Sequence, residues 1–153
     1  MAIAICSLVI LTQFKFGLQF KPELLIFMFS GAIVGYNIVK YTSVSNLYHR
    51  RLTKSMKAIQ WFTVLSALFF LGSILYFEIG TLLYMIPVVI LTALYALPIF
   101  PRGKSLRNVA RIKIYIIGLV WAIATVVVPS AVAEADFSLA LWVETLQRFL
   151  FIV

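Results

Sequence analysis

The sequence predicts an all-α protein, a multi-spanning bundle of about five to six transmembrane helices. Its residues are 63% hydrophobic and 12% charged, and its mean hydropathy is +1.07. So few polar side chains leave too little polar surface to cover a water-soluble globule. The apolar residues also gather in runs of roughly 20, the length at which a helix crosses the hydrocarbon core of a bilayer. Together, these two observations indicate an integral membrane protein.

The apolar runs predict the spans in order. The clearest cover residues 58–77, 79–100 and 114–132, and a fourth covers 24–39 behind Pro22 and Glu23, which suit a first helical turn. Residues 1–14 and 137–153 form shorter apolar runs, and the second of these stops within an apolar stretch. We therefore expect one transmembrane helical domain over residues 1–153, incomplete at both ends.

The basic residues predict the orientation of these spans. Ten of the thirteen Lys and Arg residues fall in two loops, after the second and fourth spans: Lys40, Arg50, Arg51, Lys54, Lys57, Arg102, Lys104, Arg107, Arg111 and Lys113. The acidic residues Glu23, Glu78, Glu134 and Asp136 fall in the other connections. Because cytoplasmic loops carry the excess of cations, we expect both basic loops and the amino terminus to be cytoplasmic. The net charge of +8 then reflects topology, and we expect no nucleic-acid partner.

The usual signatures of soluble enzymes and metal sites are missing. Cys6 is the single cysteine and His49 the single histidine, so neither a disulfide framework nor a His/Cys metal cluster can be built. No Ser-His-Asp set and no glycine-rich phosphate loop is present. We therefore name no catalytic residue and no metal ligand.

Three local features have both a structural and a functional interpretation. Pro87 and Pro129 lie within spans, where they kink a helix and help to shape a cavity, or are ordinary membrane-helix prolines. Asn37 and Tyr41 are four residues apart and share a helix face, either as part of a site or as interfacial residues. Small residues at 30–35 favour close helix packing.

The acidic residues also have structural explanations, at helix starts and polar turns. Glu144 differs because it lies inside the last apolar run, four residues before Arg148. This spacing predicts an ion pair within the bundle or at its edge.

The order of these features resembles the UbiA superfamily of intramembrane prenyltransferases. Residues 36–41 look like the place of the family's first polar motif, with Asn37 matching its asparagine, and Tyr95-Ala96-Leu97-Pro98 looks like its YxxP segment. The run from Ile114 to Pro129 is similar to the fifth helix, and residues 144–153 look like the sixth helix breaking off before the family's second aspartate motif. The resemblance covers nearly all of this chain and about the first half of a nine-helix family member.

The resemblance implies transfer of a prenyl group from a prenyl diphosphate to an acceptor, with Mg²⁺ ions on carboxylates neutralising the diphosphate. This chain departs from that pattern. Residues 40–57 and 102–113 contain no Asp or Glu, and the second aspartate motif would lie beyond Val153. The implied Mg²⁺ therefore lacks ligands here, and we expect a fragment or an inactive form.

The candidate site lies at the cytoplasmic mouth. The expected diphosphate contacts are Arg102, Lys104, Arg107 and Arg111, with Arg50 and Arg51 as second choices. Asn37, Tyr41 and Tyr95 are expected to line the entrance. Each cation has the alternative role of setting topology and contacting anionic membrane lipids.

A second function stays open. The chain fits a non-catalytic membrane subunit, a lipid-binding scaffold or a half-transporter that pairs with another copy or chain, because a half-bundle leaves helix faces unpacked.

Overall fold

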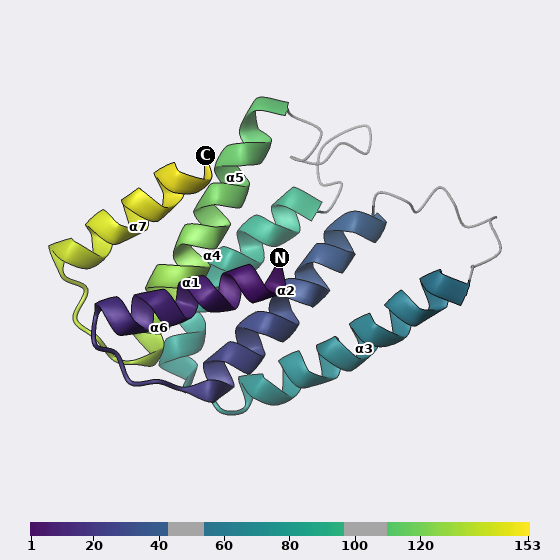
Figure 1. Cartoon of the computed structure of the whole chain (residues 1–153), viewed down its shortest axis with the longest axis horizontal. Helices are drawn as coiled ribbons and strands as arrows, with labels where there is room; N and C mark the ends of the chain where they lie inside the picture. Colours follow the sequence, from purple (N-terminus) through teal and green to yellow (C-terminus); the bar gives the residue numbers. More distant parts are fainter. Residues whose placement is uncertain (43–53, 97–109) are drawn as a thin grey trace.

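The described part of the chain is built from helices joined by short connections (Figure 1). The computed structural model describes residues 1–42, 54–96 and 110–153. The elements are α1 (Ala2–Lys15), α2 (Pro22–Thr42), α3 (Lys54–Ile74), α4 (Ile79–Ala96), α5 (Ala110–Ala122), the π-helical η4 (Ile123–Val127), α6 (Val128–Val132) and α7 (Leu139–Ile152). Since α5, η4 and α6 form one continuous rod, the described residues make six helical rods. The predicted all-α class and helix number are confirmed.

Both prolines lie inside helical rods. Pro87 is internal to α4, and Pro129 follows directly after η4. Proline lacks the N–H that would close a regular turn, and π-helical turns are a common accommodation where the hydrogen-bond ladder is interrupted. Thr125 and Ser130 turn their hydroxyls inward here, donating to the carbonyls of Trp121 at 2.7 Å and Val126 at 2.8 Å.

Three described helices are long and apolar enough to cross a membrane: Pro22–Lys40, Lys57–Ile74 and Ile112–Val132. They correspond to the expected spans 24–39, 58–77 and 114–132. α4 ends at Ala96, and residues 97–100 of the fourth expected span lie outside the described residues. α1 and α7 have 14 residues each, about 21 Å of helix against a hydrocarbon core about 30 Å thick.

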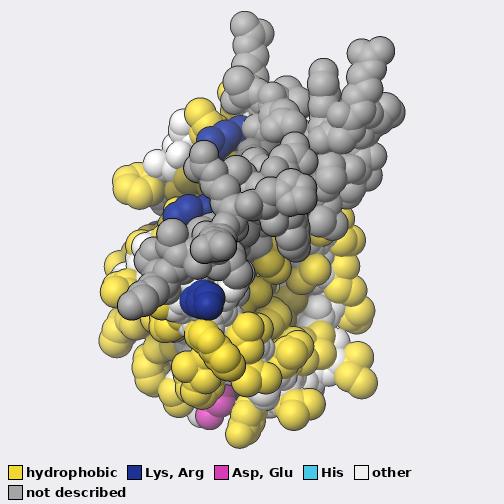
Figure 2. Space-filling model, turned by 90° about the vertical axis from the view of Figure 1, so that its right-hand side faces the viewer, with side chains coloured by type: hydrophobic (Ala, Val, Ile, Leu, Met, Phe, Trp, Pro, Cys, Tyr) yellow, Lys and Arg dark blue, Asp and Glu magenta, His cyan; other side chains and the backbone are white. Residues whose placement is uncertain are grey.

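The sides of the bundle are apolar. Large hydrophobic side chains point outward along α3 and α4, among them Trp61 at 76% and Leu83 at 60% exposure. Figure 2 shows hydrophobic side chains covering most of the described surface on one side of the molecule. An apolar surface this extensive suits hydrocarbon rather than water.

Three exposed lysines lie toward one end of the rods, and acidic residues lie toward the other. Lys40, Lys57 and Lys113 are exposed at the ends of α2, α3 and α5 that border the undescribed segments. Figure 1 places these helix ends together on one side, and Figure 2 shows basic side chains beside the grey segments. Glu23 and Glu78 lie at the opposite ends of the rods. This distribution is the one that spanning helices require, because charged groups are costly in hydrocarbon.

An aromatic contact joins α2 to α3. Phe27 stacks on Phe70 with ring centroids 4.7 Å apart, and it meets the edge of Phe77 at 5.3 Å. Gly31 lies one turn after Phe27, and a β-carbon built on it would come within 2.8 Å of the Phe70 ring. This close approach needs glycine, whereas Gly35 on the same helix has open space.

We expect Gly31→Ala to lower the unfolding free energy by about 1–3 kcal/mol, because the new methyl group pushes Phe70 off Phe27. Gly35→Ala is the matched control and should be neutral or slightly stabilising, since alanine favours helix. Thermal unfolding in detergent measures both. Equal midpoints for the two variants would contradict the packing described.

Candidate functional site

A groove runs between α1, α2 and α3, and we call it the α1–α3 groove. Its first recess, about 280 Å³, is lined by Met1, Ala2, Ala32, Ile33, Tyr36, Asn37, Lys40, Ile59 and Phe62. Its second, about 420 Å³, is lined by Cys6, Leu25, Ile26, Phe29, Ser30, Phe62, Leu65, Ser66 and Phe69. Phe62 lines both recesses, so they adjoin along the same pair of helices.

Helix periodicity explains how α2 lines this groove. Its lining positions repeat at spacings of three and four residues from Leu25 to Lys40, which keeps them on one face. These 15 steps correspond to a length of about 22 Å. The second recess is almost wholly apolar, and the polar side chains Tyr36, Asn37 and Lys40 gather in the first. The groove is therefore amphipathic along its length.

Hydrogen bonding holds Asn37 in place at the polar end. Its Nδ2 atom donates to Thr63 Oγ1 on α3 at 2.6 Å, and the Thr63 hydroxyl donates to the Ile59 carbonyl at 2.8 Å. The Lys40 ammonium lies 5.8 Å from the centre of the Tyr36 ring, a cation–π distance. The groove thus presents an ammonium group and an amide at the end where the helix cations gather.

The structure brings together only part of the site predicted from the sequence. Asn37 lines the groove, and Tyr41 is placed in α2 by its backbone alone. Tyr95 is 7% exposed near the end of α4 and is not among the residues lining either recess. Arg111 lies in α5, and its side chain is outside the description. The remaining predicted contacts lie outside the described residues: Arg50, Arg51, Arg102, Lys104 and Arg107.

Sequence reasoning missed Tyr36 and Lys40 as site residues. Their four-residue spacing was a usable signal, because it places both on one helix face beside Asn37. No local sequence pattern indicated that Met1 and Cys6 line the groove, because their position there depends on how α1 packs against α2.

The groove does not fit the magnesium ion that the resemblance implies. Its polar end offers a phenol, an amide and an ammonium, whereas Mg²⁺ prefers several oxygen ligands that include carboxylates. In the part of the chain that the structure describes, no three His, Cys, Asp or Glu residues come together. These residues suit an anion better than a metal.

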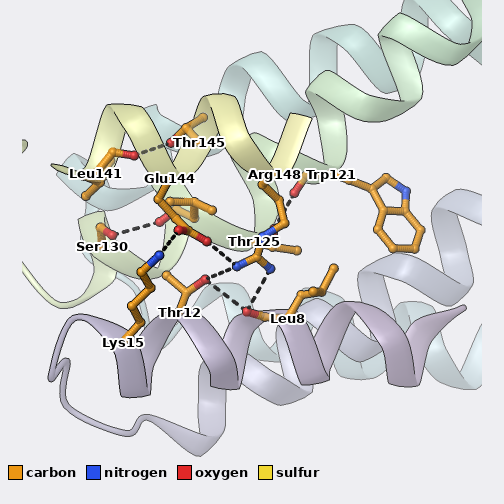
Figure 3. Close-up of polar contacts among 11 residues, drawn as sticks. Leu8, Thr12, Lys15, Trp121, Thr125, Ser130, Leu141, Glu144, Thr145 and Arg148 are labelled. Atoms are coloured by element: carbon orange, nitrogen blue, oxygen red, sulfur yellow. Dashed lines mark hydrogen bonds and ion pairs between the residues drawn. The ribbon is translucent and has the colours of Figure 1, made fainter. Parts of the chain in front are cut away.

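A second polar group of residues lies in the bundle interior (Figure 3). Glu144 Oε1 accepts a hydrogen bond from Arg148 Nη2 at 2.8 Å, which confirms the pair predicted from their spacing. Both residues are buried. No spacing in the sequence indicated that Lys15 of α1 also pairs with Glu144.

Comparisons of this chain with protein-family models, curated proteins and solved structures found no significant match.

A double-mutant cycle tests the polar contact between α2 and α3. We expect Asn37→Ala and Thr63→Ala each to destabilise, with a coupling energy of about 0.5–1.5 kcal/mol, typical of a hydrogen bond. Chemical or thermal unfolding in detergent supplies the four stabilities. Strict additivity would show that the two side chains do not interact.

Proposed function

We propose that this chain is an integral membrane protein whose α1–α3 groove binds an isoprenoid phosphate or diphosphate. The observation that carries the proposal is an apolar groove that ends at Lys40, Asn37 and Tyr36. An apolar chain in the second recess gains by leaving water, and a phosphate at the first would receive charge-assisted hydrogen bonds. Three helices long enough to span a membrane support the location.

We infer that the basic ends of the rods face the cytoplasm. Lys40, Lys57 and Lys113 lie at those ends, in keeping with the bias of cytoplasmic loops toward Lys and Arg. Arg102, Lys104, Arg107 and Arg111 follow α4 in the sequence and remain the proposed additional contacts for a diphosphate.

The chemical step proposed from the UbiA resemblance is prenyl transfer to an acceptor. The resemblance is supported by Asn37 near the end of α2 and by the YxxP segment that starts at Tyr95 near the end of α4. The polar end of the groove does not suit Mg²⁺, so we propose that the chain as given binds the prenyl donor without completing the reaction.

The second candidate is a non-catalytic membrane subunit or lipid-binding scaffold. Its supporting observation is the outward apolar face of α3, where Leu68 and Leu71 are both at least 60% exposed. A partner chain or a second copy could cover this face. Binding of a prenyl donor without turnover is compatible with both proposed functions. Prenyl transfer catalysed by the chain alone would exclude the non-catalytic subunit or scaffold.

Orientation can be tested with single cysteines in a Cys6→Ser background. We expect an impermeant thiol reagent added outside intact cells to label cysteine at Asp136 but not at Lys57, because the two positions belong to opposite ends of the rods. Lys57 should label only after permeabilisation. The reverse pattern would contradict the proposed orientation.

Ligand binding can be tested with farnesyl diphosphate, using farnesol as the uncharged analogue. We expect Lys40→Ala to weaken diphosphate binding about 2- to 5-fold, the range for an exposed ion pair, and to leave farnesol binding unchanged. Ser66→Leu should weaken both ligands, because the larger side chain fills the second recess.

Lys57→Ala is the matched control, since it removes an exposed cation of α3 that does not line the groove. Equal effects of the two lysine substitutions would mean that the diphosphate responds to general surface charge, and would overturn the proposed site.

A further inference from the structure

Three charged side chains connect the first described helix to the last. Glu144 and Arg148 of α7 are only 6% and 5% exposed, whereas the side chain of Lys15 on α1 is 52% exposed. Lys15 pairs with one oxygen of the Glu144 carboxylate, and Arg148 pairs with the other at 2.8 Å. Figure 3 shows the carboxylate held between the two cations. The ion pair within α7 is therefore also a contact with α1.

Arg148 adds further contacts to the same face of α1. Its Nη1 donates to the Leu8 carbonyl and its Nη2 to Thr12 Oγ1, each at 3.4 Å. Thr12 is fully buried and donates its own hydroxyl to Leu8 at 3.0 Å. Leu8, Thr12 and Lys15 recur every three or four residues, so they form one stripe of α1.

The helix arrangement explains why long side chains make this connection. α1 and α7 both pack against η4, the π-helical turn, and the charged side chains reach across between them. α7 has 14 residues, with Glu144 in its first half and Arg148 in its second half. Buried charges need partners, and Glu144 obtains its second cation from α1.

We propose that Lys15, Glu144 and Arg148 form a charge-specific clamp by which α1 selects α7 as its neighbour and closes the bundle around η4. The stripe of α1 is the recognition surface, and its occupant is α7 of the same chain. The sign of each charge matters, because a carboxylate at position 144 attracts Lys15 whereas a cation there would repel it.

Charge rearrangements in the full chain distinguish two possibilities: that the three charges hold α1 against α7, or that Glu144 and Arg148 form an ion pair that stabilises α7 alone. Glu144→Arg with Arg148→Glu keeps the ion pair within α7 but sets Arg against Lys15. Adding Lys15→Glu inverts all three charges and restores both ion pairs, whereas the hydrogen bonds from Arg148 to Leu8 and Thr12 stay lost in both variants. Cys6, the single cysteine, lies partly buried on α1 and reports the loosening of that helix through a thiol-reactive dye during heating.

We expect the exchanged double variant to expose Cys6 at a temperature at least 5 °C below that of the unaltered chain, and the triple variant to recover at least half of this shift. Ser7→Ala, at an exposed neighbour of Cys6 whose hydroxyl donates to the Ile3 carbonyl, is the control and should behave as the unaltered chain. The clamp would be overturned if the double variant exposed Cys6 at the same temperature as the unaltered chain. It would also be overturned if the triple variant exposed Cys6 at the same temperature as the double variant. If the double variant yields no folded protein, recovery of folded triple variant supports the clamp and its failure overturns it.

Discussion

The constraint behind this structure is that hydrocarbon does not solvate ions. The exposed lysines Lys40, Lys57 and Lys113 lie near one end of the rods and Glu78 near the other, and apolar side chains such as Trp61 and Leu83 cover the sides. Where charge does enter the interior, at Glu144 and Arg148, opposite charges meet within hydrogen-bonding distance. The same requirement accounts for inward hydroxyls such as Ser130, which donates to the carbonyl four residues earlier.

The α1–α3 groove follows from how closely α2 and α3 can approach. Gly31 lets the Phe70 ring reach the backbone of α2, and the Phe27–Phe70 stack fixes that contact. The hydrogen bond from Asn37 to Thr63 ties the same two helices together farther along. Between and beside these contacts, smaller side chains such as Ser30 and Ala32 leave the two recesses.

Much of the fold could be predicted from the sequence because its signals are local. Of the five to six spans predicted from run length, three correspond to described helices long and apolar enough to cross a membrane, and Pro22 with Glu23 predicted where α2 begins. A four-residue spacing likewise predicted the ion pair between Glu144 and Arg148.

The candidate site was less accessible to sequence reasoning because it is assembled from separate helices. Met1 and Cys6 reach the groove only through the packing of α1 on α2, and Lys15 reaches Glu144 across 129 positions of sequence. No periodicity within a single helix reports such contacts. Tyr95, which its motif predicted as an entrance residue, is buried on α4 and is not among the residues lining either recess, so its entrance role stays a prediction.

Site-specific photo-crosslinking tests the central claim, that the α1–α3 groove holds an anionic isoprenoid. A photoreactive amino acid would replace Leu65, which lines the groove, or Leu71, an exposed residue of the same helix that lines neither recess. With labelled farnesyl diphosphate in a bilayer, we expect saturable crosslinking at Leu65, abolished by excess unlabelled ligand, and only weak unsaturable labelling at Leu71. Equal, unsaturable labelling at both positions would contradict a binding site in the groove.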